Sequence, residues 1–425
     1  MALQGPFVVV ADTPATDVVE ALRAAGAFPI IETNWPDAAA AIGSVAPEAV
    51  VLAEPCSDPA RAEELGRALT DRLDAADGPF TPIIARTRED STIAVPDALA
   101  ISASVPAARI ARRLSAALRV RTLHGTVLRR MRTLASRGEP APELPDSDPL
   151  EEASVLVAGR GRSYPGLAVA VGERVGLVGA LSVESAARAL NARDIDGMVI
   201  GDGFGPRIVE ALLTVLAEDV RFRDLPVTVL GGHQGVVEEF YAHLPNLDRV
   251  AEGTDRLVDR FLPLVRLHAF GERLKRMLKS LDAQGMLDPN TGLLGHEAFW
   301  RDLNRAVDDA EKRGVGLSIA RFSFERCDRR ISLDAARLVG RLMRQVDFAC
   351  READHSIFAV FTDTDLRTAH VIARRIASVL KHTMLAPDRK QGGSGVDTAV
   401  TLATLKPTDN VASLIARVVD EVAVG

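Results

Sequence analysis

The chain has 425 residues, of which 47% are hydrophobic and 26% are charged, and its formal net charge is −7. This composition is ordinary for soluble globular domains and excludes a chain that is disordered throughout. A negative net charge does not attract nucleic acid or anionic lipid, so no DNA binding is expected.

Residues 1–135 predict a first α/β domain, because short apolar segments alternate with amphipathic ones. Gly26 stands where a helix C-terminal glycine belongs. The expected strands are 7–12, 28–33, 49–54 and 81–87, and the expected helices are 16–26, 37–45 and one through Leu65 and Leu69. Such alternation is typical of βαβ units, in which helices cover both faces of a parallel sheet.

A helix at about 106–135 closes this domain and carries eight arginines. They are Arg109, Arg112, Arg113, Arg119, Arg121, Arg129, Arg130 and Arg132. No aromatic residues are interleaved with them, so the pattern indicates a solvated or partner-binding face rather than a DNA-binding helix.

Residues 136–152 are rich in proline and acidic residues and predict a linker, after which residues 153–270 repeat the first pattern. The expected strands are 153–159, 175–181, 197–202 and 225–232, and the expected helices are 184–193 and 207–220. We therefore expect a second copy of the α/β architecture rather than a solenoid.

Residues 254–284 carry apolar side chains at alternating spacings of three and four, which predicts one long helix. Its last part, 271–285, would join the second domain to a third one or pair with its copy in a dimer. Residues 286–425 predict an α+β module with antiparallel strands. Its expected elements are a turn and helix at 287–299, strands at 316–322 and 398–405, a hairpin at 347–361, helices at 333–345, 365–381 and 410–422, and a glycine-rich turn at 391–395.

Three segments of this module resemble GGDEF domains, the nucleotidyl-cyclase-like domains of bacterial signalling. They are LDPNTGLLGHEAF (287–299), RQVDFACREADHSIFAVF (344–361) and IARRIASVL (372–380). The whole chain resembles the PleD type of response regulator and is similar to the PopA-like cyclic di-GMP effectors. The resemblance implies two degenerate, flavodoxin-like (CheY-like) doubly wound receiver domains, followed by a degenerate α+β GGDEF domain.

The signature loop departs from the family. Its two glycines, two acids and phenylalanine are replaced by Asp354, His355, Ser356, Ile357 and Phe358. The family's first strand supplies a metal-binding aspartate, whereas here the segment SIARFSFERCD (318–328) has no acid in the strand proper. A phosphoryl-transfer site without metal carboxylates loses its main electrostatic stabilisation. We therefore expect no catalytic residues, no metal and no required cofactor.

An RxxD motif remains at Arg344 and Asp347, directly before the hairpin. In the family this motif binds cyclic di-GMP away from the active site, and a second family arginine falls at Arg375. The pattern occurs six more times in the chain, so its position, not its letters, favours a binding site. The alternative is a surface turn with an incidental salt bridge, which would contribute only about 0–1 kcal/mol.

The receiver-like domains lack most of a phosphorylation site. In the first, Ala53 falls at the acceptor position next to Glu54, and Asp12 is all that remains of the acidic pair. In the second, Asp202 is the one plausible acceptor, but its partner segment reads Gly159–Arg160. Aspartyl phosphorylation needs Mg²⁺ as well as the carboxylate, so a structural role for Asp202 is favoured.

The leading hypothesis is a non-catalytic cyclic di-GMP effector or adaptor, dimeric through its receiver-like domains. One alternative is a diguanylate cyclase, which joins two GTP into cyclic di-GMP, with Asp354 and His355 replacing the missing acids. Another is a protein-interaction scaffold that binds no nucleotide.

The three cysteines are scattered, no run of eighteen apolar residues exists, and the N-terminus does not resemble a signal peptide. A cytoplasmic protein is therefore expected, with recruitment to a cell pole as a further hypothesis.

Overall fold

The computed structural model describes residues 3–76, 78–88, 95–140, 142–250, 254–325, 329–383 and 398–420. The glycine-rich turn expected at 391–395 lies outside these residues, as does Cys327. By its internal contacts the chain forms two compact units. The two-sheet unit comprises Pro6–Arg121 and Leu144–Leu274, and the single-sheet unit comprises Met1–Gly5, Thr122–Glu143 and Lys275–Gly425. None of the helices in the described ranges has the length and apolarity needed to cross a membrane.

The first sheet of the two-sheet unit has the strand order β2-β1-β3-β4-β5. Its elements are β1 (Gln4–Val10), α1 (Thr16–Ala24), β2 (Phe28–Thr33), α2 (Ala38–Val45), β3 (Ala49–Leu52), α3 (Pro59–Asp74), β4 (Ile83–Thr87) and β5 (Leu99–Ser102), followed by α4 (Ala108–Ala135). Neighbours pair in parallel from β1 through β3 and β4 to β5. This order is the flavodoxin-like one, and the predicted α/β architecture is confirmed.

The second sheet has the order β10-β9-β8-β6-β7 with parallel pairs, which is the same topology counted from its own first strand. Its elements are η1 (Pro149–Glu151), β6 (Ser154–Ala158), α5 (Tyr164–Gly172), β7 (Gly176–Ala180), α6 (Val183–Ala192), β8 (Gly197–Ile200), α7 (Pro206–Glu218), η2 (Val220–Phe222), β9 (Val227–Leu230), α8 (Gln234–Phe240) and β10 (Leu247–Val250). Strands β5 and β10 were not predicted, because LAIS and LDRV lack the run of large apolar side chains that marks AVVL in β3 and GMVI in β8.

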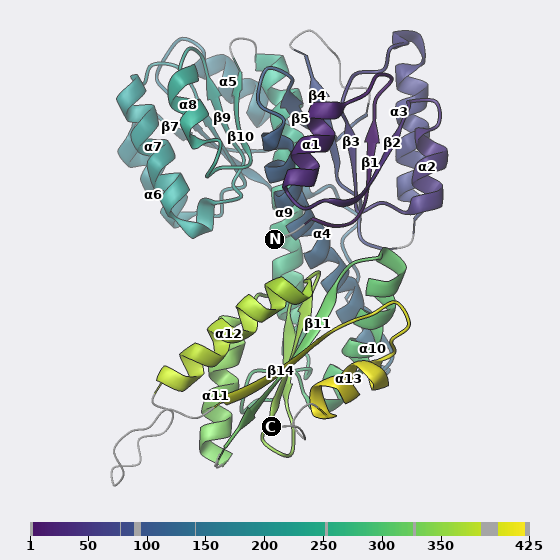
Figure 1. Cartoon of the computed structure of the whole chain (residues 1–425). Coiled ribbons are helices and arrows are strands. Elements are labelled where there is room, and N and C mark those ends of the chain that lie inside the picture. Colours follow the sequence, from purple (N-terminus) through teal and green to yellow (C-terminus); the bar gives the residue numbers. More distant parts are fainter. Residues whose placement is uncertain are drawn as a thin grey trace. The chain divides into compact units, whose positions relative to one another are not determined.

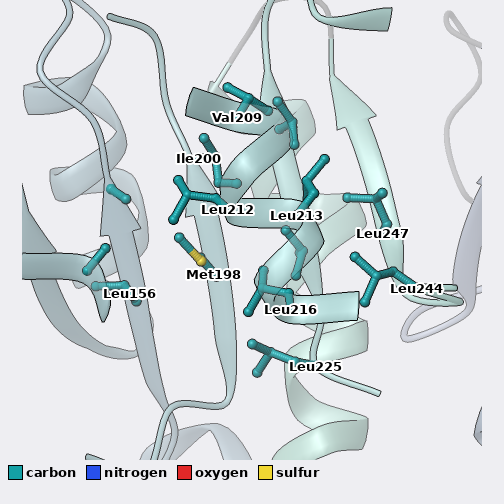
Figure 2. Packing of buried hydrophobic residues seen from close by; sticks show 14 of the residues in the cluster. Leu156, Met198, Ile200, Val209, Leu212, Leu213, Leu216, Leu225, Leu244 and Leu247 are labelled. Carbon is teal, nitrogen blue, oxygen red and sulfur yellow. The ribbon is translucent and has the colours of Figure 1, made fainter. Parts of the chain in front are cut away.

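The core of the second sheet shows how the sequence pattern becomes packing. Helix α7 buries Leu212, Leu213 and Leu216, which share one face at helical spacing. Figure 2 shows these side chains beside Met198 and Ile200 of β8, both fully buried. Burial of each leucine contributes about 1.5–3 kcal/mol, so this face of α7 fixes the helix against the sheet.

The arginine-rich helix α4 is not the solvated face that its sequence predicts. Five of its eight arginines are buried, namely Arg109, Arg113, Arg121, Arg129 and Arg130. Arg113 is fully buried and donates to the main-chain oxygens of Leu247 and Pro245 at 3.1 and 3.3 Å. Burial lowers the pKa of Arg113 to about 9, although the nearby Asp248 opposes this. The prediction fails because long arginine stems pack like apolar side chains while the guanidinium satisfies strand and loop carbonyls.

The single-sheet unit contains an antiparallel sheet of order β12-β13-β11-β14, as the α+β prediction requires. Its elements are α9 (Thr254–Ala283), α10 (His296–Arg313), β11 (Leu317–Phe324), α11 (Arg329–Leu342), β12 (Phe348–Arg351), β13 (Ile357–Thr362), α12 (Leu366–His382), β14 (Thr398–Thr404) and α13 (Val411–Asp420). Helices α11 and α12 cover one face of the sheet, and α10 and α13 cover the other (Figure 1). Of α9, the part from Lys275 onward belongs to this unit.

A buried ionic cluster joins the end of α4 to this sheet. Asp302 of α10 has no exposed surface and lies 3.0 Å from Arg129 Nε and 2.6 Å from Arg130 Nη1. The two guanidinium groups also lie 5.2 and 5.4 Å from the ring centroid of Phe348 on β12. Cation–π attraction and two ion pairs therefore hold this part of α4 against α10 and β12.

Candidate functional site

The β12–β13 hairpin separates the two places at which the sequence predicts function. The RxxD turn precedes β12 at the open end of the hairpin, beside the last residue of β13, Thr362. The altered signature loop forms the closed end, where Arg351 pairs with Ile357. At about 3.3 Å per residue, the length of β13 places the two ends roughly 17 Å apart.

At the open end, Arg344 and Asp347 form a two-point ion pair. Arg344 Nε and Nη2 donate to the two carboxylate oxygens of Asp347 at 2.8 and 2.7 Å. Nη2 of Arg344 also donates to the main-chain oxygen of Thr362 at 3.0 Å and to Thr364 Oγ1 at 2.8 Å. The main-chain N–H of Thr362 donates to Asp347 at 3.1 Å. The motif therefore ties the turn to the end of β13.

Only one member of this pair faces solvent. The side chain of Asp347 is 0% exposed, whereas that of Arg344 is 32% exposed. Burial raises the pKa of Asp347, against the opposing effect of Arg344. In this conformation both carboxylate oxygens are used within the chain, so Arg344 is the group that a ligand would meet. A direct contact of Asp347 with guanine stays a prediction.

Arg375 is brought to the same turn from a distant part of the sequence. It is exposed on α12, and its Nη2 donates to the main-chain oxygen of Leu342 at 3.2 Å. Leu342 is the last residue of α11, two residues before Arg344. The arginine that the resemblance pairs with the RxxD motif therefore lies at the end of the helix that leads into it.

At the closed end, the loop folds on itself. Asp354 accepts hydrogen bonds from the main-chain N–H of Ser356 at 3.0 Å and from its hydroxyl at 2.6 Å, while Ser356 O accepts from Glu352 N at 2.9 Å. His355 adopts φ of 71°, the left-handed region that glycine occupies without steric cost. The turn therefore carries a side chain at a position where close approach of a ligand to the backbone would favour glycine.

The acidic residue of this loop, Asp354, forms an ion pair with an arginine. Arg321 of β11 donates from Nη2 to Asp354 Oδ2 at 2.7 Å. Burial acts to raise the pKa of Asp354, but hydrogen bonds from Ser356 and Arg321 outweigh it and lower the pKa. The remaining loop positions, Ile357 and Phe358, are buried strand residues. Nowhere in the described part of the chain do three or more His, Cys, Asp or Glu side chains gather as metal ligands would.

Asp202 follows β8 and is held by the loop after β6. The main-chain N–H of Ser163 donates to its carboxylate at 3.2 Å, and the hydroxyl of Ser163 donates to the same oxygen. A Cβ at Gly161 would collide with that carboxylate. The loop after β6 therefore covers Asp202, which agrees with a structural role for this carboxylate.

The corresponding acid of the first sheet is also engaged by main chain. Asp12 accepts from Trp35 N at 3.3 Å and from Ser57 N at 2.9 Å. Burial opposes the shift, yet the hydrogen bonds from Ser57 and Trp35 lower the pKa of Asp12. Glu54 instead accepts from the hydroxyl of Thr13 at 2.8 Å. Each acid thus supports a local turn.

Sequence reasoning missed one feature of the single-sheet unit, an open groove of about 520 Å³ beside the RxxD turn. It is lined by Lys275, Arg276, Lys279, Asp282, Ala283, Leu287 and Gln345. Gln345 is the second residue of the RxxD motif, and the cations come from the end of α9. Lys275 and Lys279 are four residues apart and thus share a helix face, which is a signal present in the sequence.

No family model matches the chain, and no curated protein matches it. Solved GGDEF structures are similar to part of it. The coiled coil and GGDEF domain of DgcB from Caulobacter crescentus, in complex with c-di-GMP, is 20% identical over 35% of this chain and 84% of that one, with a TM-score of 0.31. The diguanylate cyclase SiaD of Pseudomonas aeruginosa, in complex with its activator SiaC, is 16% identical over 52% and 96%, with a TM-score of 0.31. The FimX GGDEF domain of Pseudomonas aeruginosa is 16% identical over 32% and 90%, with a TM-score of 0.28.

Proposed function

We propose that this chain is a non-catalytic effector or adaptor of bacterial signal transduction that binds cyclic di-GMP at the RxxD turn. The observation that carries the proposal is the arrangement of Arg344, a partly exposed guanidinium fixed at two points by a buried carboxylate. An incidental surface salt bridge has two exposed partners, which differs from this arrangement.

The chemistry of the turn suits this ligand. A guanidinium presents a rigid set of donors to a phosphate or to the O6 and N7 acceptors of guanine. Arg344 would make these contacts, Arg375 would supply a second cation at the end of α11, and Asp347 would position Arg344. Because both carboxylate oxygens of Asp347 accept hydrogen bonds from Arg344, the proposed role of Asp347 is to orient that arginine.

The closed end of the hairpin supports the absence of catalysis. Mg²⁺ in phosphoryl-transfer sites is held by carboxylates, and the acid of this loop, Asp354, is neutralised by Arg321. His355 places a side chain where the family loop has glycine. The loop is therefore proposed to be a structural turn that neither binds the metal nor approaches GTP.

The two flavodoxin-like sheets are proposed to be degenerate receiver domains that act as interaction surfaces. Asp202 and Asp12 are held by neighbouring loops, which supports receivers that are not switched by phosphorylation. A homodimer through these domains and recruitment to a cell pole remain predictions. Light scattering of the purified chain tests the first of them.

Isothermal titration calorimetry with cyclic di-GMP tests the proposed function. We expect heat of binding from the wild-type chain, and we expect no cyclic di-GMP when the chain is incubated with GTP and Mg²⁺ and the products are separated by chromatography. Product formed at many turnovers would show an active cyclase instead. No heat with cyclic di-GMP and no product from GTP would indicate a scaffold that binds no nucleotide.

A further inference from the structure

The groove beside the RxxD turn is strongly cationic on one wall. Lys275, Arg276 and Lys279 are exposed at the end of α9, and the one acid among the lining residues is Asp282. Burial raises the pKa of Asp282, although Arg130 opposes this, so its carboxyl is less readily ionised than an exposed one. The lining residues therefore include three cations and one acid, a composition that favours an anion.

The position of the groove restricts which anion it takes. The residues that line it also include Gln345, the residue directly after Arg344. Arg375 contacts the other end of the same turn, through the main-chain oxygen of Leu342. Arg375 therefore contacts the start of the turn, and Gln345, the second residue of the motif, lines the same groove as the cations of α9. A ligand held by Arg344 would therefore lie at a turn whose next residue lines the groove.

We infer that the groove binds the phosphodiester backbone of the same cyclic dinucleotide whose guanine or phosphate is held by Arg344. This inference rests on the proposed function and extends it to residues outside the RxxD motif. A volume of about 520 Å³ falls in the range of small-molecule sites, about 300–1,000 Å³, whereas a single phosphate would fill a small part of it. Gln345 offers an amide donor and acceptor at the junction of the two subsites.

The inference gives α9 a role in signalling. The helix is continuous from Thr254 to Ala283, and its residues before Lys275 belong to the two-sheet unit. A dinucleotide that contacts Lys275 and Lys279 would therefore touch a helix shared by both units. Ligand occupancy would act on that helix directly, without passing through the signature loop.

The test is titration of cyclic di-GMP into the full chain carrying Lys275→Gln and Lys279→Gln, at several salt concentrations. Two exposed cations, each contributing up to about fivefold, predict binding about 3- to 25-fold weaker than wild type. The dependence of affinity on salt should also become shallower, because fewer charges are neutralised on binding. The single variant Lys312→Gln removes one charge from the exposed surface of α10 at a residue that does not line the groove, and it should bind like wild type.

The outcomes separate the groove from the RxxD site. Unchanged affinity and salt dependence in the double variant, with weakened binding in Arg344→Ala, would overturn the groove inference and leave the proposed function standing. No binding by the wild-type chain would overturn both. A further variant, Lys279→Glu, should weaken binding more than Lys279→Gln, and equal effects of the two would also contradict an electrostatic contact with phosphate.

Discussion

We expect Arg344→Ala to weaken cyclic di-GMP binding by about 10- to 150-fold, because a charge-assisted hydrogen-bonding group contributes about 1.5–3 kcal/mol. Arg344 is the exposed member of its pair, and Asp347 and Thr364 hold its Nε and Nη2 in a fixed direction. A lysine carries the same charge but cannot form the two-point pair, so Arg344→Lys should recover only part of the affinity. Calorimetry on the three proteins measures these differences.

The same substitution also removes the partner of a buried carboxylate, and this effect needs its own control. Without Arg344, Asp347 would keep the N–H of Thr362 but lose its counter-ion. The double variant Arg344→Ala, Asp347→Asn removes that uncompensated charge. If the guanidinium contacts the nucleotide, the double variant stays weak. Recovery of wild-type affinity in the double variant would show that Arg344 acts only by stabilising the turn.

We expect Asp302→Ala to lower the free energy of unfolding of the single-sheet unit by about 3–5 kcal/mol. Removal of one member of a buried ionic group leaves uncompensated charge behind. Here Arg129 and Arg130 would lose the same fully buried partner, and Arg130 would keep, among the described carboxylates, only Asp282, at 3.4 Å. Because the chain has several domains, a single two-state fit does not apply. Hydrogen exchange of peptides from α10 and β12 at increasing urea concentration measures the loss.

Asp309→Ala is the matched control for this substitution. Asp309 lies on the same helix, and Arg132, on the same arginine-rich helix, approaches it at 3.6 Å with side-chain exposures of 52% for Arg132 and 26% for Asp309. An exposed pair of this kind contributes about 0–1 kcal/mol. Equal losses for Asp302→Ala and Asp309→Ala would show that the buried cluster does not hold α4 against α10.

The α/β pattern was readable from sequence where segments were long and periodic. Helix α7 and strands β3 and β8 follow from apolar runs of the right length, and they form the core of their sheets. Strands β5 and β10 could not be predicted, because their segments LAIS and LDRV lack a run of large apolar residues and are defined by pairing with β4 and β9. The prediction that the α4 arginines form a solvated face was wrong for a related reason. Their burial depends on carbonyl partners that lie far away in the sequence.

At the candidate site, the sequence predicts where the RxxD motif lies in the chain but not how its side chains are arranged. The RxxD letters give no sign that Asp347 is buried and Arg344 partly exposed, which follows from Thr362 and Thr364 at the end of β13. Arg321 was overlooked because its partner, Asp354, is 33 residues away and meets it only through the pairing of β11 with β13. Local patterns reveal element type and motif position, whereas such contacts depend on strand register.

Hydrogen exchange of the full chain with and without cyclic di-GMP tests the central claim most directly, because it reports where the nucleotide acts. Binding at the RxxD turn predicts slower exchange in peptides covering 342–347 and the neighbouring part of α12, with no change in the hairpin loop at 352–356. Protection of the loop at 352–356, or no protection of any peptide at saturating nucleotide, would contradict the account.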